Sequence, residues 1–101
     1  MIKSFSDTGT KKIFLGAPLT KKERKVLGSL NLAKAAQRLS QLDVIDQKTL
    51  LITPALHYHH LHGTDRYSID ADSRKSKWRI TFRWENKEMT DVELVKIEDT
   101  H

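Results

Sequence analysis

The chain has no cysteine among its 101 residues. Without cysteine, neither a disulfide framework nor a thiolate metal site can hold the fold together. Long apolar runs are also missing: no stretch approaches the roughly 18 consecutive apolar residues of a membrane-spanning helix, and residues 1–5 lack the long apolar region of a signal peptide. We therefore expect a cytoplasmic protein that does not enter a membrane, uses no cofactor and is stabilised by packing.

The sequence also lacks internal repeats and low-complexity linkers, so residues 1–101 are expected to form a single domain. Apolar residues make up 38% of the chain and charged residues 31%, which is typical of a folded domain with a charged surface. A domain of this size buries only about 60 to 65% of the surface that its unfolded chain exposes. The core is therefore expected to be small.

Positive charge exceeds negative charge: 18 Lys and Arg face 13 Asp and Glu, for a formal net charge of +5. Such an excess attracts polyanions but is also common in proteins that never bind one. The basic residues form an early group and a late group: Lys11, Lys12, Lys21, Lys22, Arg24 and Lys25, then Arg74, Lys75, Lys77, Arg79 and Arg83. Several acids lie close to the end of the chain. This distribution suits an enzyme that binds RNA and keeps proton carriers at one place.

The first half of the sequence predicts helices. A short helix is expected within residues 7–15. Thr20 followed by Glu23 forms a capping box, in which each side chain satisfies a backbone donor at the start of a helix. From there to about Leu42, apolar residues recur at intervals of three or four, as one buried helical face requires. Residues 28–31 would either divide this stretch into two helices or only weaken it.

The second half predicts strands. Residues 67–71 alternate between apolar and polar side chains, and Trp78–Trp84 does so more strongly. A last strand is expected at about residues 90–97. Its apolar residues change from even-numbered to odd-numbered positions between Leu94 and Val95, which indicates a bulge or burial on both faces.

Helices followed by an antiparallel sheet predict an α+β fold, in which a small sheet packs against two or three N-terminal helices. Residues 2–5 would form an edge strand. The apolar residues of the clearest strand, which would cover the helices, are Trp78, Ile80, Phe82 and Trp84. Alternation then leaves Arg79, Thr81 and Arg83 on the opposite face, which is expected to be cationic.

Four of the five histidines fall within residues 57–63. On a strand, His57 and His59 would point to one face and His60 and His62 to the other, so joint binding of one zinc ion would require a sharp bend. We therefore expect no metal site. A histidine-based zinc protein is an alternative function, which a metal-free preparation of untagged protein with full stability would exclude. Exposed histidines without a role are one alternative, and a histidine that transfers protons near neutral pH is the other.

The acidic C-terminal segment is a second candidate for chemistry. A charged terminus is ordinarily a frayed, solvated tail. Here it directly follows a predicted strand, and residues 97, 99 and 101 would share a face if that strand continued. Asp99 and His101 would then form an acid/base pair.

Five segments of the chain resemble, in the same order, segments of HigB toxins of the RelE/ParE superfamily. They read M-I-K-S-F at 1–5, H-H-L-H-G at 59–63, Y-S-I at 67–69, W-R-I-T-F at 78–82 and I-E-D-T-H at 97–101. The family segments usually read M-I-K-S-F, H-P-L-K-G, W-S-I, W-R-I-T-F and Y-E-D-Y-H. The resemblance implies a RelE-like microbial RNase fold and ribosome-dependent cleavage of mRNA in the A site of the 70S ribosome. It also implies a cognate antitoxin encoded alongside, expected to be a helix-turn-helix protein, with operator DNA bound only through the antitoxin complex.

The resemblance assigns the catalytic roles to His59, Arg79, Asp99 and His101. Attack of a 2′-hydroxyl group on the adjacent phosphate needs a base, an acid for the leaving oxygen and positive charge on the phosphoryl oxygens. His59 or His101 would act as base or acid, and Arg79 would hold the phosphate through two hydrogen bonds.

The chain departs from the family pattern at three places. His62 replaces a lysine, and Thr100 replaces a tyrosine whose ring could stack on a base. The segment between Ile69 and Trp78 is longer than in the family, so either Arg74 or Lys75 would supply its basic residue. The expected RNA-binding residues are thus His62, Arg74, Lys75, Arg83 and Thr100.

These departures leave an alternative function. A protein that kept the fold and the charge but lost the chemistry would be a catalytically weak or inactive module that binds RNA or the antitoxin. Ribosome binding without cleaved message would distinguish that module from the endoribonuclease.

Overall fold

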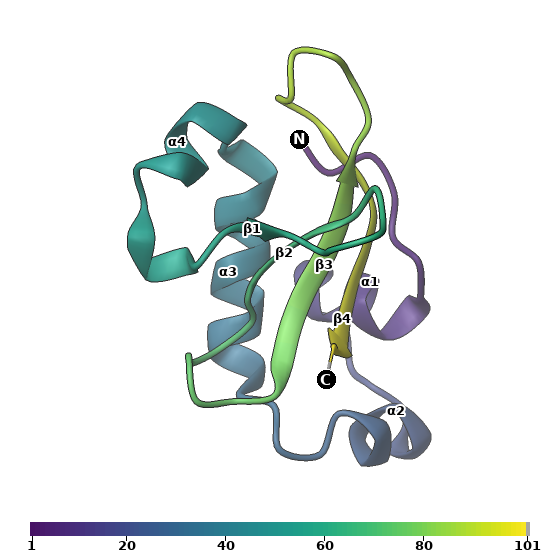
Figure 1. The fold of residues 1–101 in the computed structure, drawn as a ribbon. Coiled ribbons are helices and arrows are strands. Elements are labelled where there is room, and N and C mark those ends of the chain that lie inside the picture. Colours follow the sequence, from purple (N-terminus) through teal and green to yellow (C-terminus); the bar gives the residue numbers. More distant parts are fainter. Residues whose placement is uncertain (101) are drawn as a thin grey trace.

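The computed structural model describes residues 1–100, and His101 lies outside the described residues. The helices are α1 (Thr8–Leu15), α2 (Lys21–Val26), α3 (Leu32–Val44), α4 (Gln47–Leu51) and the 3-10 helix η1 (Pro54–Leu56). The strands are β1 (His59–His60), β2 (Tyr67–Asp70), β3 (Trp78–Trp84) and β4 (Val92–Asp99). Within the described residues they form one antiparallel sheet in the order β1-β2-β3-β4. The predicted α+β class, with helices preceding the sheet, is confirmed (Figure 1).

Side-chain caps explain where the helices begin. The predicted capping box is present at α2: the Thr20 hydroxyl accepts from the Glu23 backbone N–H, and the Glu23 carboxylate accepts from the Thr20 backbone N–H. Asn31 caps α3 by accepting from the backbone N–H of Lys34 at 3.1 Å. The helical stretch is therefore divided in two. Helix α4 was not predicted, and it begins at Asp46, whose carboxylate caps its first turn.

The predicted irregularity in the last strand is a bulge. Thr81 lies opposite Lys96 and Arg83 lies opposite Glu93, so two residues of β4 oppose Phe82 alone. One of those two, Leu94, has a φ of 53°, which is the left-handed region that non-glycine residues seldom adopt. The extra residue explains the shift of apolar parity in the sequence.

The N-terminal segment, predicted as an edge strand, runs beside β4 without forming an extended strand. It makes two isolated parallel bridges, from Ile2 to Val92 and from Phe5 to Val95. The N-terminal segment and the C-terminal strand therefore lie together in the structure.

The core lies between the sheet and the helices α1 and α3, which Figure 1 shows on one side of the sheet. Leu39 and Leu42 of α3 are completely buried, as are Ile80 and Phe82 of β3. These apolar residues of β3 face the core, as predicted. No helix of the described part of the chain has the length and apolar character to cross a membrane.

Candidate active site

Polar side chains occupy the face of the sheet that points away from the core. Residues that lie directly opposite each other on antiparallel strands share a face, and two such rows cross the sheet here. Together with Arg66, whose guanidinium group bonds to Thr81, these rows make up what we call the polar face: His59, Arg66, Ser68, Asp70, Arg79, Thr81, Lys96 and Glu98.

His59 is exposed on the edge strand β1, and its ring is held at both nitrogens. Nδ1 lies 3.0 Å from the carbonyl oxygen of His57. A carbonyl oxygen only accepts, so Nδ1 is the donor in this contact and Nε2 is the ring nitrogen left for contact with a reactant. Nε2 lies 3.2 Å from the hydroxyl group of Ser68, which is itself buried. The ring therefore leans from the edge of the sheet over β2.

Glu98 leans over the sheet from the opposite edge. Its Oε2 accepts a hydrogen bond of 2.5 Å from the Thr81 hydroxyl group. The same hydroxyl oxygen accepts from Arg66 Nη2 at 2.9 Å, and Arg66 also donates to the carbonyl oxygen of Leu94 at 2.6 Å. The buried Thr81 thus links one cation and one acid on the polar face.

The contacts of His59 and Glu98 converge on neighbouring residues. Ser68, which His59 touches, lies directly opposite Thr81, to which Glu98 is bonded. The Cβ atoms of such a pair are about 5 Å apart. An imidazole ring, which can transfer a proton, and a carboxylate therefore approach one spot from two sides.

Arg79 occupies a buried position on the polar face, with 6% of its surface exposed. Its Nη1 donates to the carbonyl oxygens of Ser76 and Trp78 at 2.6 and 2.8 Å, and its Nη2 donates to that of Arg74 at 3.3 Å. Its Nε lies 3.4 Å from Asp70 Oδ1. In this structure the guanidinium group is thus committed to the protein, and its predicted role in holding a phosphate stays a prediction.

The other predicted RNA-binding residues differ in how they are held. Arg83 bonds to Glu93 and Asp65, at 2.7 and 3.1 Å, and the bond to Glu93 is the main reason that its pKa is raised. Four others are exposed: His62, Arg74, Lys75 and Thr100. Because Asp65 and Glu93 pair with Arg83, the face that was expected to be cationic also carries acids.

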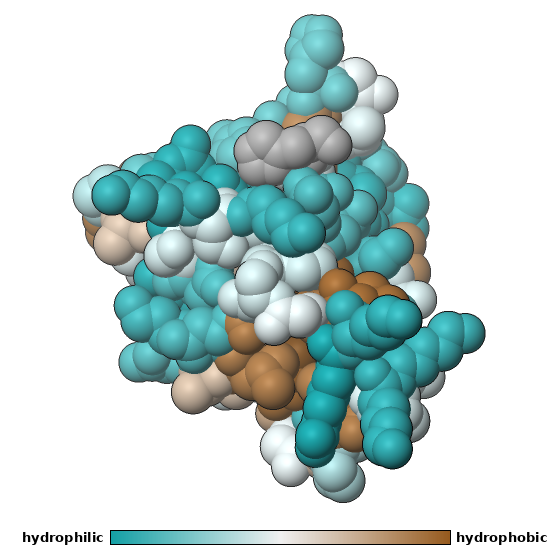
Figure 2. Space-filling view, turned by 90° about the horizontal axis from the view of Figure 1, so that it is seen from below, coloured by the Kyte–Doolittle hydropathy of each residue, from teal (hydrophilic) through white to brown (hydrophobic). Residues whose placement is uncertain are grey.

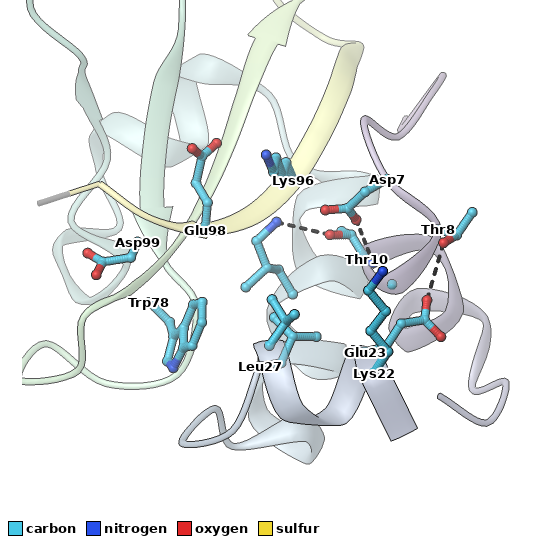
Figure 3. Close-up of a pocket in the computed structure, with 13 residues that line it drawn as sticks. Asp7, Thr8, Thr10, Lys22, Glu23, Leu27, Trp78, Lys96, Glu98 and Asp99 are labelled. Carbon is cyan, nitrogen blue, oxygen red and sulfur yellow. Dashed lines mark hydrogen bonds between the residues drawn. The ribbon is translucent and has the colours of Figure 1, made fainter. Parts of the chain in front are cut away.

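Asp99 lies on the other face from His59. It opposes Trp78, whereas Glu98 opposes Arg79, and Figure 3 shows Asp99 beside Trp78 with Glu98 extending to the other side of the strand. The structure does not bring Asp99 and His59 together. His101, the fourth predicted catalytic residue, lies outside the described residues.

Asp99 instead borders a groove of about 470 Å³ between α1, α2 and β4. Its apolar lining includes Leu27, Trp78 and Ile97. Figure 2, which views the molecule from the end where α2 lies, shows apolar surface surrounded by hydrophilic side chains.

The four clustered histidines occupy different local structures. Only His59 and His60 belong to a strand, and they lie opposite Ser68 and Tyr67, on opposite faces of the sheet. Within residues 1–100, no three His, Cys, Asp or Glu side chains are grouped so that they could hold a metal ion.

Sequence reasoning missed Arg66, Ser68, Asp70 and Glu98. The alternation within residues 67–71 placed Ser68 and Asp70 on one face, and that alternation was the available signal. The partners of these residues on β1, β3 and β4 depend on strand register, which the sequence alone did not define.

Comparisons with protein-family models, with curated proteins and with solved structures find no match for this chain.

Proposed function

We propose that this chain is an endoribonuclease toxin of a type II toxin-antitoxin system. It would act in the cytoplasm by cleaving mRNA in the ribosomal A site, and a cognate antitoxin would neutralise it. The observation that carries the proposal is the convergence of His59 and Glu98 over the opposed residues Ser68 and Thr81. The five segments that resemble HigB toxins support mRNA on the ribosome as the substrate.

The proposed reaction needs two proton transfers. The ionised Glu98 takes the proton of the ribose 2′-hydroxyl group, whose oxygen then attacks the adjacent phosphorus. The bond from phosphorus to the 5′-oxygen breaks, and protonated His59 donates its Nε2 proton to that oxygen. The products are a 2′,3′-cyclic phosphate end and a 5′-hydroxyl end, and no oxidant, reductant or other reactant is required.

Positive charge beside the reacting phosphate is the third requirement. Arg66 is held by Thr81 next to the point where His59 and Glu98 converge. Arg74 lies at the end of the same face, with 58% of its side chain exposed. These two arginines are better placed to contact RNA than the buried Arg79.

A reconstituted translation reaction tests the proposal. Purified protein is added to ribosomes that are paused on a defined message, and primer extension locates any cut. We expect cuts in the A site for the wild-type protein and a loss of about a hundredfold in rate for His59→Gln, as removal of a proton carrier generally causes. The 3′ ends should carry the cyclic phosphate.

His60→Gln is the matched control. His60 is the next residue of the same strand and points to the other face, where its ring lies 5.1 Å from that of Tyr67. This variant should cleave at nearly the wild-type rate. Equal rates for wild type, His59→Gln and His60→Gln would contradict the proposed role of His59, and intact message in every reaction would contradict the proposed activity.

The catalytically inactive binding module is the second candidate. It is favoured by the burial of Arg79 and by the position of Asp99 on the opposite face, because these are two of the four residues that the resemblance assigns to catalysis. The same reaction distinguishes the two functions. Protein that sediments with ribosomes while the message stays intact would favour the module.

A further inference from the structure

Asp70, the last residue of β2, is a buried acid that the proposed reaction does not use. Its exposure is 1%, yet three basic side chains reach its carboxylate. Arg74 Nη1 and Arg79 Nε lie 3.2 and 3.4 Å from Oδ1, and His57 Nε2 lies 3.8 Å from Oδ2. A buried charge is tolerated only when it is paired. The Asp70 carboxylate therefore needs these partners, and its contacts hold the three basic side chains around it.

Arg74 is fixed at both its side chain and its backbone. Asp70 holds the guanidinium group, and the buried Arg79 donates to the Arg74 carbonyl oxygen at 3.3 Å. A guanidinium group has five N–H donors, and the hydrogen bond to Asp70 uses one of them. With 58% of this side chain exposed, the outer edge of the group is preorganised for an anion.

His57 approaches the same carboxylate from the other side. It follows η1 with a φ of 52°, and non-glycine residues held in this left-handed region are often found at functional sites. Its ring is 43% exposed. Its carbonyl oxygen also accepts from His59 Nδ1, so the segment that presents His57 also orients the proposed acid.

We propose that Asp70 is a positioning residue that presents Arg74 and His57 as a binding site for a backbone phosphate of RNA next to His59. The inference rests on the proposed function for the identity of the anion. An arginine fork matches the oxygens of a phosphate, and a ring N–H group of His57 beside it adds a second donor. Loss of Asp70 would leave both groups without the contact that aligns them.

The test measures binding separately from cleavage. The probe is a fluorescent 12-nucleotide single strand with 2′-O-methyl sugars, which lacks the attacking hydroxyl group, and its affinity is measured by anisotropy at several salt concentrations. We expect Arg74→Gln to weaken binding about tenfold or more, as loss of a charged hydrogen bond does. The slope of log affinity against log salt should fall by about 0.7, the value for one phosphate contact on a single strand.

Lys34→Gln is the control, because it removes the same charge from α3, in the helical layer. Its affinity should stay within about twofold of wild type, since a charge distant from the RNA is largely screened. Equal effects of Arg74→Gln and Lys34→Gln would overturn the site, as would a wild-type protein that does not bind the probe at low salt.

Asp70→Asn tests the positioning role, because the two explanations predict opposite changes in RNA affinity. The substitution keeps the shape of the side chain and makes the face more positive, so attraction by net charge alone would tighten RNA binding. We expect weaker binding instead, with little further loss when Arg74→Gln is added. Tighter binding by folded Asp70→Asn would overturn the role of Asp70.

Arg74→Lys decides the matter if Asp70→Asn does not fold. Lysine keeps the charge but has a single ammonium group, which cannot bridge Asp70 and a phosphate as a fork does. We expect Arg74→Lys to lose most of the affinity that Arg74→Gln loses, and wild-type affinity would overturn the proposal. If the variants bind as expected while wild-type protein leaves ribosomal message intact, the phosphate site stands and the proposed cleavage fails.

Discussion

Glu98 and Asp99 are consecutive residues of β4 that lie on opposite faces of the sheet, because Glu98 opposes Arg79 and Asp99 opposes Trp78. Only Glu98 shares a face with His59. We therefore expect Glu98→Gln to slow single-turnover cleavage of ribosome-bound message about a hundredfold, in the range of a lost general base. Asp99→Asn should change that rate by less than about threefold, since its side chain borders the groove beside Trp78.

The two isosteric amides make this comparison direct, because each removes one negative charge and little volume. A greater loss for Asp99→Asn than for Glu98→Gln would contradict the assignment of the base. It would instead favour the acid that the resemblance to HigB toxins implies.

Arg79 and Arg74 share Asp70 as a partner but should differ in their effects on stability. Arg79→Gln removes the buried partner of a buried carboxylate, and breaking such a pair costs about 3 to 5 kcal/mol. Arg74→Gln removes an exposed partner, and exposed ion pairs contribute about 0 to 1 kcal/mol. Urea denaturation followed by circular dichroism measures both free energies of unfolding. Similar losses of unfolding free energy for the two variants would show that Arg79 does not stabilise the fold more than Arg74 does.

The sequence predicted those elements whose signals are local. The capping box of Thr20 and Glu23 and the alternation of Trp78–Trp84 depend only on near neighbours, and both are present. The parity shift at Leu94 likewise marked the bulge. Helix α4 has only five residues, which is too short to display a helical period.

The missed parts of the candidate site depend on contacts between distant residues. The burial of Arg79 follows from its pairing with Asp70 on the neighbouring strand. The parity of the last strand correctly placed residues 97 and 99 on one face. Ile97 is buried in the core, so the face that residues 97 and 99 share points toward the helices. The register of β4 against β3 determines which face this is.

A core substitution tests the packing of α3 against the sheet. Leu39 is completely buried, so Leu39→Ala should leave a cavity and lower the free energy of unfolding by about 2 to 5 kcal/mol. Val44, near the end of the same helix, is 83% exposed, and Val44→Ala should change stability by no more than about 0.5 kcal/mol. Chemical denaturation of both variants provides the comparison. A small loss for Leu39→Ala would contradict the placement of α3 in the core.

Glu23 should make the stability of the protein sensitive to acid. A hydrogen bond from Lys12 at 2.8 Å is the main reason that the pKa of Glu23 falls from 4.5 to about 2, and the Thr20 backbone N–H contributes as well. A group whose pKa is lowered by folding stabilises the folded state above its unfolded pKa, and that stability is lost as the pH falls toward the folded pKa. The contribution of Glu23 should therefore disappear between about pH 5 and about pH 2.

Thermal melting of wild type and Glu23→Gln across this range measures the effect. The variant should melt at a lower temperature at neutral pH, because it loses the ion pair that joins α2 to α1. The two melting temperatures should converge toward pH 2, where the wild-type carboxylate becomes protonated and its bond to Lys12 loses its ionic character. Glu88→Gln, which removes an exposed acid from the turn between β3 and β4, should follow the wild-type curve throughout. Parallel curves for wild type and Glu23→Gln would mean that the pKa of Glu23 is not lowered by folding.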